Sequence, residues 1–425
     1  MALIDMFLSR AVKRGQLTLH RPGKPPATFG TPDPDYGHIT IRFADSGVAG
    51  RIVRNPALAA GEMYMDGRLT VDGDDIMGLV RLLKRNSAWE RGQNALKPSA
   101  FVQGLGAVKH RLDRINMERR SKRNVAHHYD LSARLYDLFL DADKQYSCAY
   151  YTSPDNTLEQ AQTDKLAHIA AKLALRPGMR VLDIGCGWGG MALYLNRHFG
   201  VEVLGVTLSE EQLKIARERA AAAGVSDTVK FELIDYRRVE GRFDRIVSVG
   251  MFEHVGPPQY RTFFRKCRDL LTPDGVMLLH TIGRLGPPSV TDDWTTKYIF
   301  PGGYNPALSE VMQAFEGLKL FLTDVEVLRL HYAYTLHEWY RRTLAARDQI
   351  VALYDERFYR MWTFYLAGAA NAFESGGLVN YQIQFSRSRT ELPITRDYMF
   401  EGERALRAPS VPANAGTQSH EDQSA

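Results

Sequence analysis

The segment Val181–Gly190, VLDIGCGWGG, constrains the fold of this chain more than any other stretch of the sequence. Its first four residues have the apolar character of a buried strand, and Asp183 lies near the end of that strand. Four glycines follow, at Gly185, Gly187, Gly189 and Gly190. Glycine suits a backbone that turns sharply and approaches a ligand closely, and a helix starting there presents free N–H groups. The segment therefore predicts a strand, a tight turn and a helix beside a ligand.

Two classes of ligand fit this turn. Gly185, Gly187 and Gly190 satisfy the GxGxxG pattern of dinucleotide-binding folds, which is a weak signal by itself. Asp183 suits an ammonium or hydroxyl group better than a pyrophosphate. Thr207 ends the next predicted strand, where a nicotinamide site needs an acidic residue for the ribose. We therefore predict an S-adenosylmethionine site, and a tight turn that binds nothing stays open as the alternative.

Helix and strand patterns alternate through residues 126–400. They predict an α/β methyltransferase domain, class I methyltransferase-like, with a doubly wound, mostly parallel sheet. The strand patterns lie at 179–185, 201–207, 229–234, 243–250, 276–282 and 379–388, and the clearest helix patterns at 158–175, 209–224 and 259–271. Residues 284–330 interrupt the alternation with an aromatic-rich stretch, which predicts a lid or a substrate wall. Ligands of such sheets lie beyond the carboxyl ends of the strands.

The rest of the chain divides into three segments. Residues 1–85 have short strand patterns, turns and one helix pattern, and predict a small N-terminal α+β domain. Residues 86–125 predict a basic linker with helical pieces. Residues 405–425 are small, polar and proline-containing, which is typical of a disordered tail.

Positive charge is concentrated between residues 81 and 124, where twelve Lys or Arg residues face three acidic ones. One interpretation is attraction to an anionic lipid surface or to nucleic acid. The other interpretation is a solvated helix face. No added RNA-binding motif is obvious, and we expect no nucleic-acid partner.

Cysteine use and apolar runs limit the remaining classes. Cys148, Cys186 and Cys267 lie far apart, so neither a disulfide framework nor a zinc site is expected. The adjacent His127 and His128 make a poor metal pair, and we predict no metal. No apolar run approaches the ~20 residues that span a bilayer. These features predict a cytoplasmic protein that can still touch a membrane.

An ordered series of motifs identifies a family resemblance. The motifs are HHYDL, LFLDADKQYSCAYY, VLDIGCGWGG, GVTLSEEQ, MFEHVG, LLHTIG, KYIFPGGY and HYAYTL. Together they resemble the cyclopropane-fatty-acyl-phospholipid synthases and the related mycolic acid cyclopropane synthases, closely over about residues 125–390 and more loosely over 1–100. The resemblance implies methyl transfer from S-adenosylmethionine to the cis double bond of an unsaturated acyl chain in a membrane phospholipid. Bicarbonate-assisted deprotonation would then close a cyclopropane ring.

The same resemblance implies a location and an assembly for the chain, which we expect to be a homodimer held peripherally at the inner face of the membrane. With an anionic phospholipid bilayer as substrate, the basic stretch is expected to dock on it, since each nearby cation contributes ~1 kcal/mol at such a surface.

The resemblance also implies the site residues. Besides Asp183, Gly185, Gly187 and Gly189, the expected cofactor contacts are Tyr146, Ser147, Thr207, Leu208, Ser209, Gln212, Asp235 and Tyr236. The expected bicarbonate site consists of Cys148, Glu253, His280, Ile282 and Tyr332. Cys148 and Ile282 would contribute main-chain groups, His280 and Tyr332 would donate hydrogen bonds, and Glu253 would accept one while orienting His280. Taken singly, each of these residues also fits a structural role.

Two positions depart from the family pattern. Ala369 stands where many members have cysteine, and Tyr334 replaces the arginine of a HYARTL motif. An alkene methylation needs no thiol nucleophile, so activity is still expected. Tyr304 and Tyr332 are candidates for shielding a carbocation with their aromatic faces. A methyl-branched or methylene product, another methyltransferase substrate and a non-catalytic lipid-binding role stay open.

Overall fold

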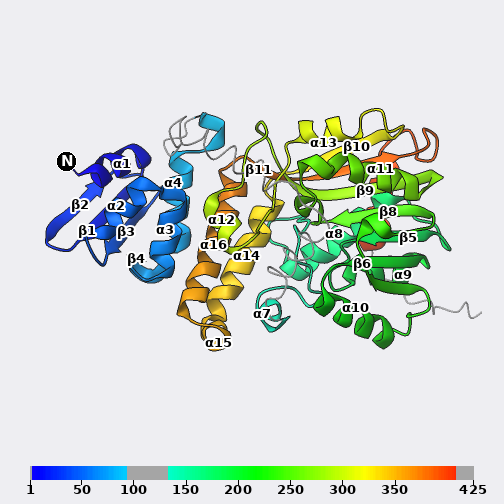
Figure 1. Cartoon of the computed structure of the whole chain (residues 1–425), viewed down its shortest axis with the longest axis horizontal. Helices are drawn as coiled ribbons and strands as arrows, with labels where there is room; N and C mark the ends of the chain where they lie inside the picture. Colours follow the sequence, from blue (N-terminus) through cyan, green and yellow to red (C-terminus); the bar gives the residue numbers. More distant parts are fainter. Residues whose placement is uncertain (1, 93–132, 408–425) are drawn as a thin grey trace, which may run out of the picture.

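The computed structural model describes residues 2–92 and 133–407. A seven-stranded sheet dominates the larger part, with strand order β10-β11-β9-β8-β5-β6-β7 (Figure 1). Its strands are β5 (Arg180–Ile184), β6 (Glu202–Thr207), β7 (Val229–Leu233), β8 (Phe243–Val249), β9 (Leu271–Arg284), β10 (Phe321–Leu328) and β11 (Leu378–Ser386). Strands β5 to β9 run parallel, whereas β11 is antiparallel to both its neighbours. The predicted doubly wound, mostly parallel sheet is confirmed.

Helices cover both faces of this sheet. They are α8 (Leu158–Leu173), α9 (Gly190–Phe199), α10 (Glu210–Ala222), α11 (Tyr260–Leu270), α13 (Leu308–Phe315) and α17 (Asp397–Arg407), and the short α7 (Ala133–Asp137) precedes them. Val181 packs in one apolar cluster with Leu166 of α8, while its neighbour Leu182 packs in another with Phe263 of α11. Since successive side chains of a strand point to opposite faces, the two clusters are the two layers of the core.

The long segment predicted as an insertion is only partly one. Strand β9 continues to Arg284, and β10 pairs with β11 along the sheet edge, so this part of the segment is sheet rather than lid. Between them lie α12 (Asp293–Tyr298) and α13. The lid prediction was wrong for β10. Its apolar residues Phe321 and Leu322 are adjacent in the sequence and both are exposed, so they do not follow the alternation that identifies a half-buried strand.

The N-terminal part contains a second sheet with strand order β2-β1-β3-β4. Its elements are α1 (Leu3–Ala11), β1 (Gln16–Arg21), β2 (Lys24–Phe29), β3 (His38–Phe43), α2 (Gly47–Arg54), α3 (Pro56–Met65), β4 (Leu69–Val71) and α4 (Ile76–Asn86). The α+β character is as predicted, although α1, α2 and α3 were missed. The boundary at residue 85 stays a prediction. Most of the predicted linker, residues 93–125, lies outside the described residues.

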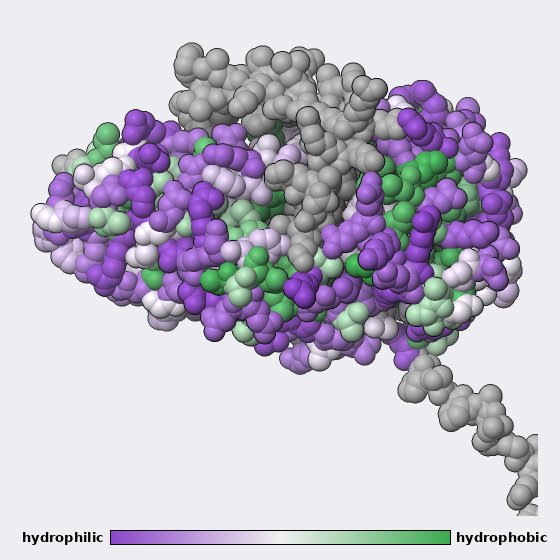
Figure 2. Space-filling model, turned by 60° about the horizontal axis from the view of Figure 1, so that its bottom comes forward, coloured by the Kyte–Doolittle hydropathy of each residue, from purple (hydrophilic) through white to green (hydrophobic). Residues whose placement is uncertain are grey.

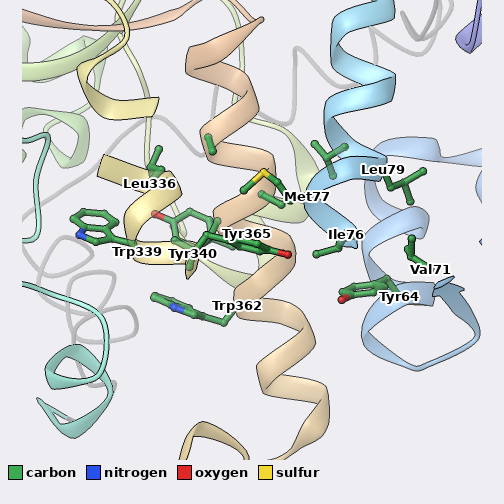
Figure 3. Packing of buried hydrophobic residues seen from close by; sticks show 14 of the residues in the cluster. Tyr64, Val71, Ile76, Met77, Leu79, Leu336, Trp339, Tyr340, Trp362 and Tyr365 are labelled. Carbon is green, nitrogen blue, oxygen red and sulfur yellow. The ribbon is translucent and has the colours of Figure 1, made fainter. Parts of the chain in front are cut away.

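Three helices join the two parts: α14 (His331–Ala345), α15 (Arg347–Leu353) and α16 (Glu356–Glu374). Figure 3 shows α16 between α14 and the N-terminal helices, with Tyr64 and Met77 on one side and Trp362 and Tyr365 on the other. These side chains belong to one continuous apolar cluster. An ion pair between Arg357 of α16 and Asp66 adds to the junction.

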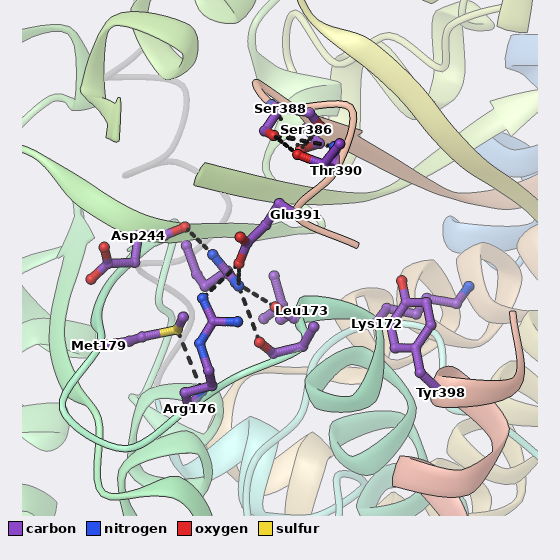
Figure 4. A network of polar contacts seen from close by, with 12 residues as sticks. Lys172, Leu173, Arg176, Met179, Asp244, Ser386, Ser388, Thr390, Glu391 and Tyr398 are labelled. Atoms are coloured by element: carbon purple, nitrogen blue, oxygen red, sulfur yellow. Dashed lines mark hydrogen bonds and ion pairs between the residues drawn. The ribbon is translucent and has the colours of Figure 1, made fainter. Parts of the chain in front are cut away.

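The C-terminal end of α8 is held by the buried Arg245, and Figure 4 labels its partners Leu173 and Glu391. Arg245 of β8 is fully buried, and its guanidinium donates to the carbonyls of Leu173 and Ala174 at 2.5 and 3.1 Å. The same guanidinium lies 2.8 Å from the carboxylate of Glu391. Helix α17 reaches Arg407, so residues 405–407 are helical, which corrects the start of the predicted tail, and the remainder of the tail lies outside the described residues.

Candidate active site

A cavity of about 1180 Å³, which includes its open mouth, lies beyond the carboxyl ends of β5, β6 and β8. Ten of the twelve residues predicted to contact the cofactor line it: Tyr146, Ser147, Asp183, Gly185, Gly187, Thr207, Leu208, Gln212, Asp235 and Tyr236. The cavity therefore lies where a doubly wound sheet binds its ligand.

The other two predicted residues, Gly189 and Ser209, support the wall from behind. Gly189 has a φ of +82°, and a side chain there would come within 2.6 Å of the ring of Phe231. Ser209 caps α10, because its hydroxyl accepts a hydrogen bond from the backbone N–H of Gln212 at 3.3 Å. Both residues shape the cavity without lining it.

Gly190 permits a close approach between the glycine turn and the segment before α8. A methyl group at Gly190 would collide with the side chains of Gln145 and Asp143. Gln145 lines the cavity, and Asp143 forms an ion pair with Arg219 of α10. The glycine thus lets two walls of the cavity meet.

Asp183 is a buried carboxyl group at the end of β5, with 2% of its surface exposed. One of its oxygens has no hydrogen-bond partner among the described residues. Burial raises the pKa of Asp183 to about 7, and the positive charge of Lys165 opposes that rise. A buried acceptor without a partner is costly, so this group is suited to an ammonium or hydroxyl donor from a ligand.

Asp235 follows β7 and is held in place by its own loop. Its two carboxylate oxygens accept hydrogen bonds from the guanidinium of Arg237 at 2.8 and 2.6 Å. Tyr236 is buried beside it, with its ring edge-on to Phe263. The predicted adenine contact at Asp235 therefore involves a carboxylate that is already paired with an arginine.

The residues predicted for bicarbonate form two groups. In the first, Glu253 follows β8, and one carboxylate oxygen accepts a hydrogen bond from the backbone N–H of Ile282 at 2.6 Å. Its other oxygen is buried and has no partner within the described part of the chain. Burial raises the pKa of Glu253 to about 7.

His280 lies two residues before Ile282 on β9, and its partners differ from the prediction. The amide nitrogens of Asn380 and Gln382 on β11 lie 3.3 and 3.2 Å from its two ring nitrogens. Glu253 thus holds Ile282, and the β11 amides orient His280, because β11 is the strand paired directly with β9. Burial lowers the pKa of His280 to about 3, which keeps the imidazole neutral.

The second group contains Cys148 and Tyr332. Cys148 is buried, and burial raises the pKa of its thiol well above the usual range, so the thiol stays protonated. The next residue, Ala149, donates its N–H to the Thr335 hydroxyl of α14 at 3.1 Å. Tyr332 lies one turn earlier on α14, with its ring against Phe373. Helix α14 therefore carries Tyr332 and anchors the segment that contains Cys148.

The predicted shielding tyrosine Tyr304 is buried and supports Glu253. Its backbone N–H donates to the Glu253 carbonyl at 2.9 Å, and its hydroxyl donates to Glu310 at 2.8 Å. Of the two departures, Ala369 is partly buried on α16, whereas Tyr334 is 37% exposed on α14. Their consequences stay predictions.

His254 and Lys165 are among the residues at the cavity that the sequence did not single out. His254 lines it, and burial lowers the pKa of this histidine to about 4. Lys165 lies behind it on α8, and its ammonium donates to Gln145 Oε1 at 2.6 Å and to Ser147 Oγ at 2.9 Å. A single lysine in a helix pattern normally indicates a solvated position, so only the folded chain reveals this one. In residues 2–92 and 133–407, no group of three or more His, Cys, Asp or Glu side chains could hold a metal ion.

The sheet order, the antiparallel strand β11 between β9 and β10, and the cavity define a class I methyltransferase fold. Residues 116–383 match the family described as mycolic acid cyclopropane synthetase, and the chain belongs to this family.

Comparisons with individual proteins agree. The cyclopropane-fatty-acyl-phospholipid synthase of Escherichia coli K12 is 42% identical over 347 residues, covering 82% of this chain and 87% of that protein. The cyclopropane synthase MmaA2 from Mycobacterium tuberculosis superposes with a TM-score of 0.60 at 33% identity, covering 62% of this chain and 98% of that structure. The mycolic acid cyclopropane synthase CmaA1 complexed with SAH and CTAB superposes with a TM-score of 0.59 at 36% identity, again covering 62% of this chain and 98% of that structure.

Proposed function

We propose that this protein transfers the methyl group of S-adenosylmethionine to the cis double bond of an unsaturated acyl chain in a membrane phospholipid and closes a cyclopropane ring. The observation that carries the proposal is the buried Glu253 carboxylate, which holds the Ile282 amide with one oxygen and offers the other to a ligand. The similarity to the E. coli synthase supports the acyl-phospholipid substrate. The SAH-bound relative supports the methyl donor, because 98% of that structure aligns with this chain at 36% identity.

The chemistry requires a base close to the new methyl group. The electron pair of the double bond forms a bond to the methyl carbon. The sulfur–carbon bond breaks, and sulfur keeps the electron pair of that broken bond in the product S-adenosylhomocysteine. A carbocation is left on the chain. Loss of a proton from the new methyl group then supplies the C–H electron pair that closes the third ring bond, so charge and atoms balance.

Bicarbonate would supply the base that takes this proton. The described residues fit such an anion at Glu253, whose free carboxylate oxygen can accept its O–H. His280 would donate a ring N–H to the anion only in place of one of its β11 amide partners. Tyr332 can donate its hydroxyl from α14. Cys148 contributes main-chain atoms rather than a nucleophile, since its thiol stays protonated. The aromatic rings of Tyr332 and Trp339, in edge contact at 5.8 Å, help to exclude water from a carbocation.

We further propose that the enzyme acts as a homodimer and binds the cytoplasmic face of the membrane peripherally. No helix in the described ranges is long and apolar enough to cross a bilayer. Figure 2 shows a largely hydrophilic face with separate apolar patches. Four basic residues of the stretch lie within the described residues. Lys84 and Arg91 are exposed, whereas Arg81 and Arg85 of α4 pair with Glu374, and the part from 93 to 124 lies outside the described residues.

Salt tests the membrane contact. We expect binding to anionic phospholipid vesicles to weaken steeply between low and high ionic strength, because exposed charges are screened beyond ~8–10 Å under physiological conditions. Co-sedimentation with anionic and zwitterionic vesicles measures this. Equal binding at both salt concentrations would refute electrostatic docking.

Turnover is tested with labelled S-adenosylmethionine and vesicles of a monounsaturated phospholipid. Wild-type protein should transfer label to the acyl chain, and Glu253→Ala should not. Mass spectrometry after derivatisation of double bonds separates a ring from a methylene or unsaturated branched product. Tight S-adenosylhomocysteine binding without transfer would instead indicate a non-catalytic lipid-binding protein.

A further inference from the structure

Lys165 is a fully buried lysine in the middle of α8, with 0% of its surface exposed. Lysines are almost never fully buried unless their charge is paired. Its ammonium donates to the side chains of Gln145 and Ser147, at 2.6 and 2.9 Å, and both of those residues line the cofactor cavity. The charge is therefore directed at one wall of the active site.

A second side chain of α8 holds the backbone of the same wall. Gln162, one turn before Lys165, donates to the carbonyl oxygens of Gln145 and Ser147 at 3.1 and 3.0 Å. Gln145 also donates to Asp143 at 2.6 Å, and Asp143 pairs with Arg219 of α10. Since Gln162 already fixes the backbone, a lysine is not needed to hold the segment in place. The distinctive contribution of Lys165 is its positive charge.

The active site has a cofactor half, which contains Asp183, and an anion half, which contains Cys148 and His280. The charge of Lys165 affects groups in both. Lys165 lowers the pKa of Cys148, Asp141 and Asp183 against the effect of burial, and it adds to the fall in the pKa of His280. Burial lowers the pKa of Lys165 itself to about 8, while nearby acidic groups oppose that fall. The groups that interact with it are Asp141, Asp143, Cys148, Asp183 and His280. They come from the segment before α8, from β5 and from β9.

We propose that Lys165 is a positioning residue shared by the two halves of the active site. Its ammonium orients Gln145 and Ser147 toward the methyl donor. It also places a positive charge beside Ser147, the residue before Cys148, where that charge favours an anion. The second part rests on the proposed bicarbonate-dependent function, whereas the first depends only on cofactor binding.

Lys165→Met and Lys165→Arg separate the charge from the shape of the side chain. Calorimetry with S-adenosylhomocysteine measures the cofactor half without turnover. We expect Lys165→Met to weaken this binding about tenfold or more, because hydrogen bonds from a charged donor are lost. Wild-type affinity should fall between pH 7 and 9 as the ammonium loses its proton. The Met variant should lack that fall, and the Arg variant should keep its charge and its affinity.

Lys172→Met is the matched control for cofactor binding. Lys172 lies two turns further along α8, is 2% exposed and pairs with Glu326 rather than with the cavity wall. Its loss should lower the melting temperature about as much as the loss of Lys165 and leave S-adenosylhomocysteine affinity within about twofold. Equal loss of S-adenosylhomocysteine affinity in Lys165→Met and Lys172→Met would overturn the proposal. So would a Lys165→Met variant whose affinity depends on pH as in wild type.

Bicarbonate titration tests the second half. In buffer depleted of carbon dioxide, turnover by wild type should rise with added bicarbonate, and Lys165→Met should need about tenfold more for half-maximal rate. If wild type does not respond to bicarbonate, the proposed base is wrong, and Lys165 is then judged on cofactor affinity alone. If wild type and the Met variant respond at the same concentration, the anion role of Lys165 is wrong while the proposed function stands.

Discussion

Replacing Glu253 with glutamine should stabilise the fold while abolishing turnover. In the folded protein the carboxyl has a pKa of about 7, compared with 4.5 for the free group. This difference in pKa means that ionising the carboxyl costs roughly 3 kcal/mol more in the folded protein than in the unfolded chain. A group with a raised folded pKa contributes stability below its unfolded pKa and loses it as pH rises through the folded pKa. Wild type should therefore lose roughly 3 kcal/mol between pH 4.5 and 7 through this one group.

Urea unfolding of wild type and Glu253→Gln at several pH values measures the effect. The gap between the two free energies of unfolding should widen from pH 5 to 7 in favour of the variant and stay constant above pH 7. Glu240→Gln, at an exposed glutamate, is the control and should give a gap near zero throughout. A Glu253→Gln gap that does not change with pH would show that the buried carboxyl does not titrate as argued.

The effect on turnover has the same origin. Ionised Glu253 can accept the O–H of a bound anion, so the wild-type rate should rise with pH around 7. The amide of the variant cannot ionise and offers a donor where an acceptor is needed. A variant that keeps the wild-type rate would exclude Glu253 from the reaction.

Two further substitutions test the framework around the site. Arg245→Met should destabilise the protein by about 3–5 kcal/mol in urea unfolding, because it leaves buried partners unpaired. Arg180→Met, at a side chain 55% exposed on the neighbouring strand, should cost less than about 1 kcal/mol, and equal losses would contradict the burial argument. Gly190→Ala should weaken S-adenosylhomocysteine binding about tenfold, equivalent to ~1.4 kcal/mol, by displacing Gln145. Gly368→Ala, where a methyl group meets nothing, should leave that affinity unchanged.

The cofactor cavity could be predicted from the sequence because its residues lie close to the ends of strands. The apolar run before Gly185 and the one before Thr207 each identify a strand, and parallel strands bring their carboxyl ends to the same edge. The partners of His280 could not be predicted in this way. Asn380 follows it by a hundred residues and reaches it only through the pairing of β11 with β9.

The missed elements share a physical cause. Strand β10 has one neighbour and exposes Phe321, Leu322 and Val327, so its apolar residues do not alternate with the period of a half-buried strand. Helices α2 and α3 meet at Asn55 and Pro56, where a short helix ends and the next begins, and such short helices give a weak periodic signal. Tertiary packing against α16, rather than local sequence, stabilises α3.

The position of Lys165 depends on how α8 is held at its two ends. At the start of the helix, the Thr157 hydroxyl accepts the N–H of Gln160 at 3.2 Å, and at its end Arg245 binds the carbonyls that the helix leaves open. The ammonium between these ends is buried where its charge is disfavoured, so the helix must be rigid to keep it beside Ser147. It follows that Arg245, although remote from the reacting groups, stabilises the geometry of the active site through α8. Loosening it should affect cofactor affinity as well as the free energy of unfolding.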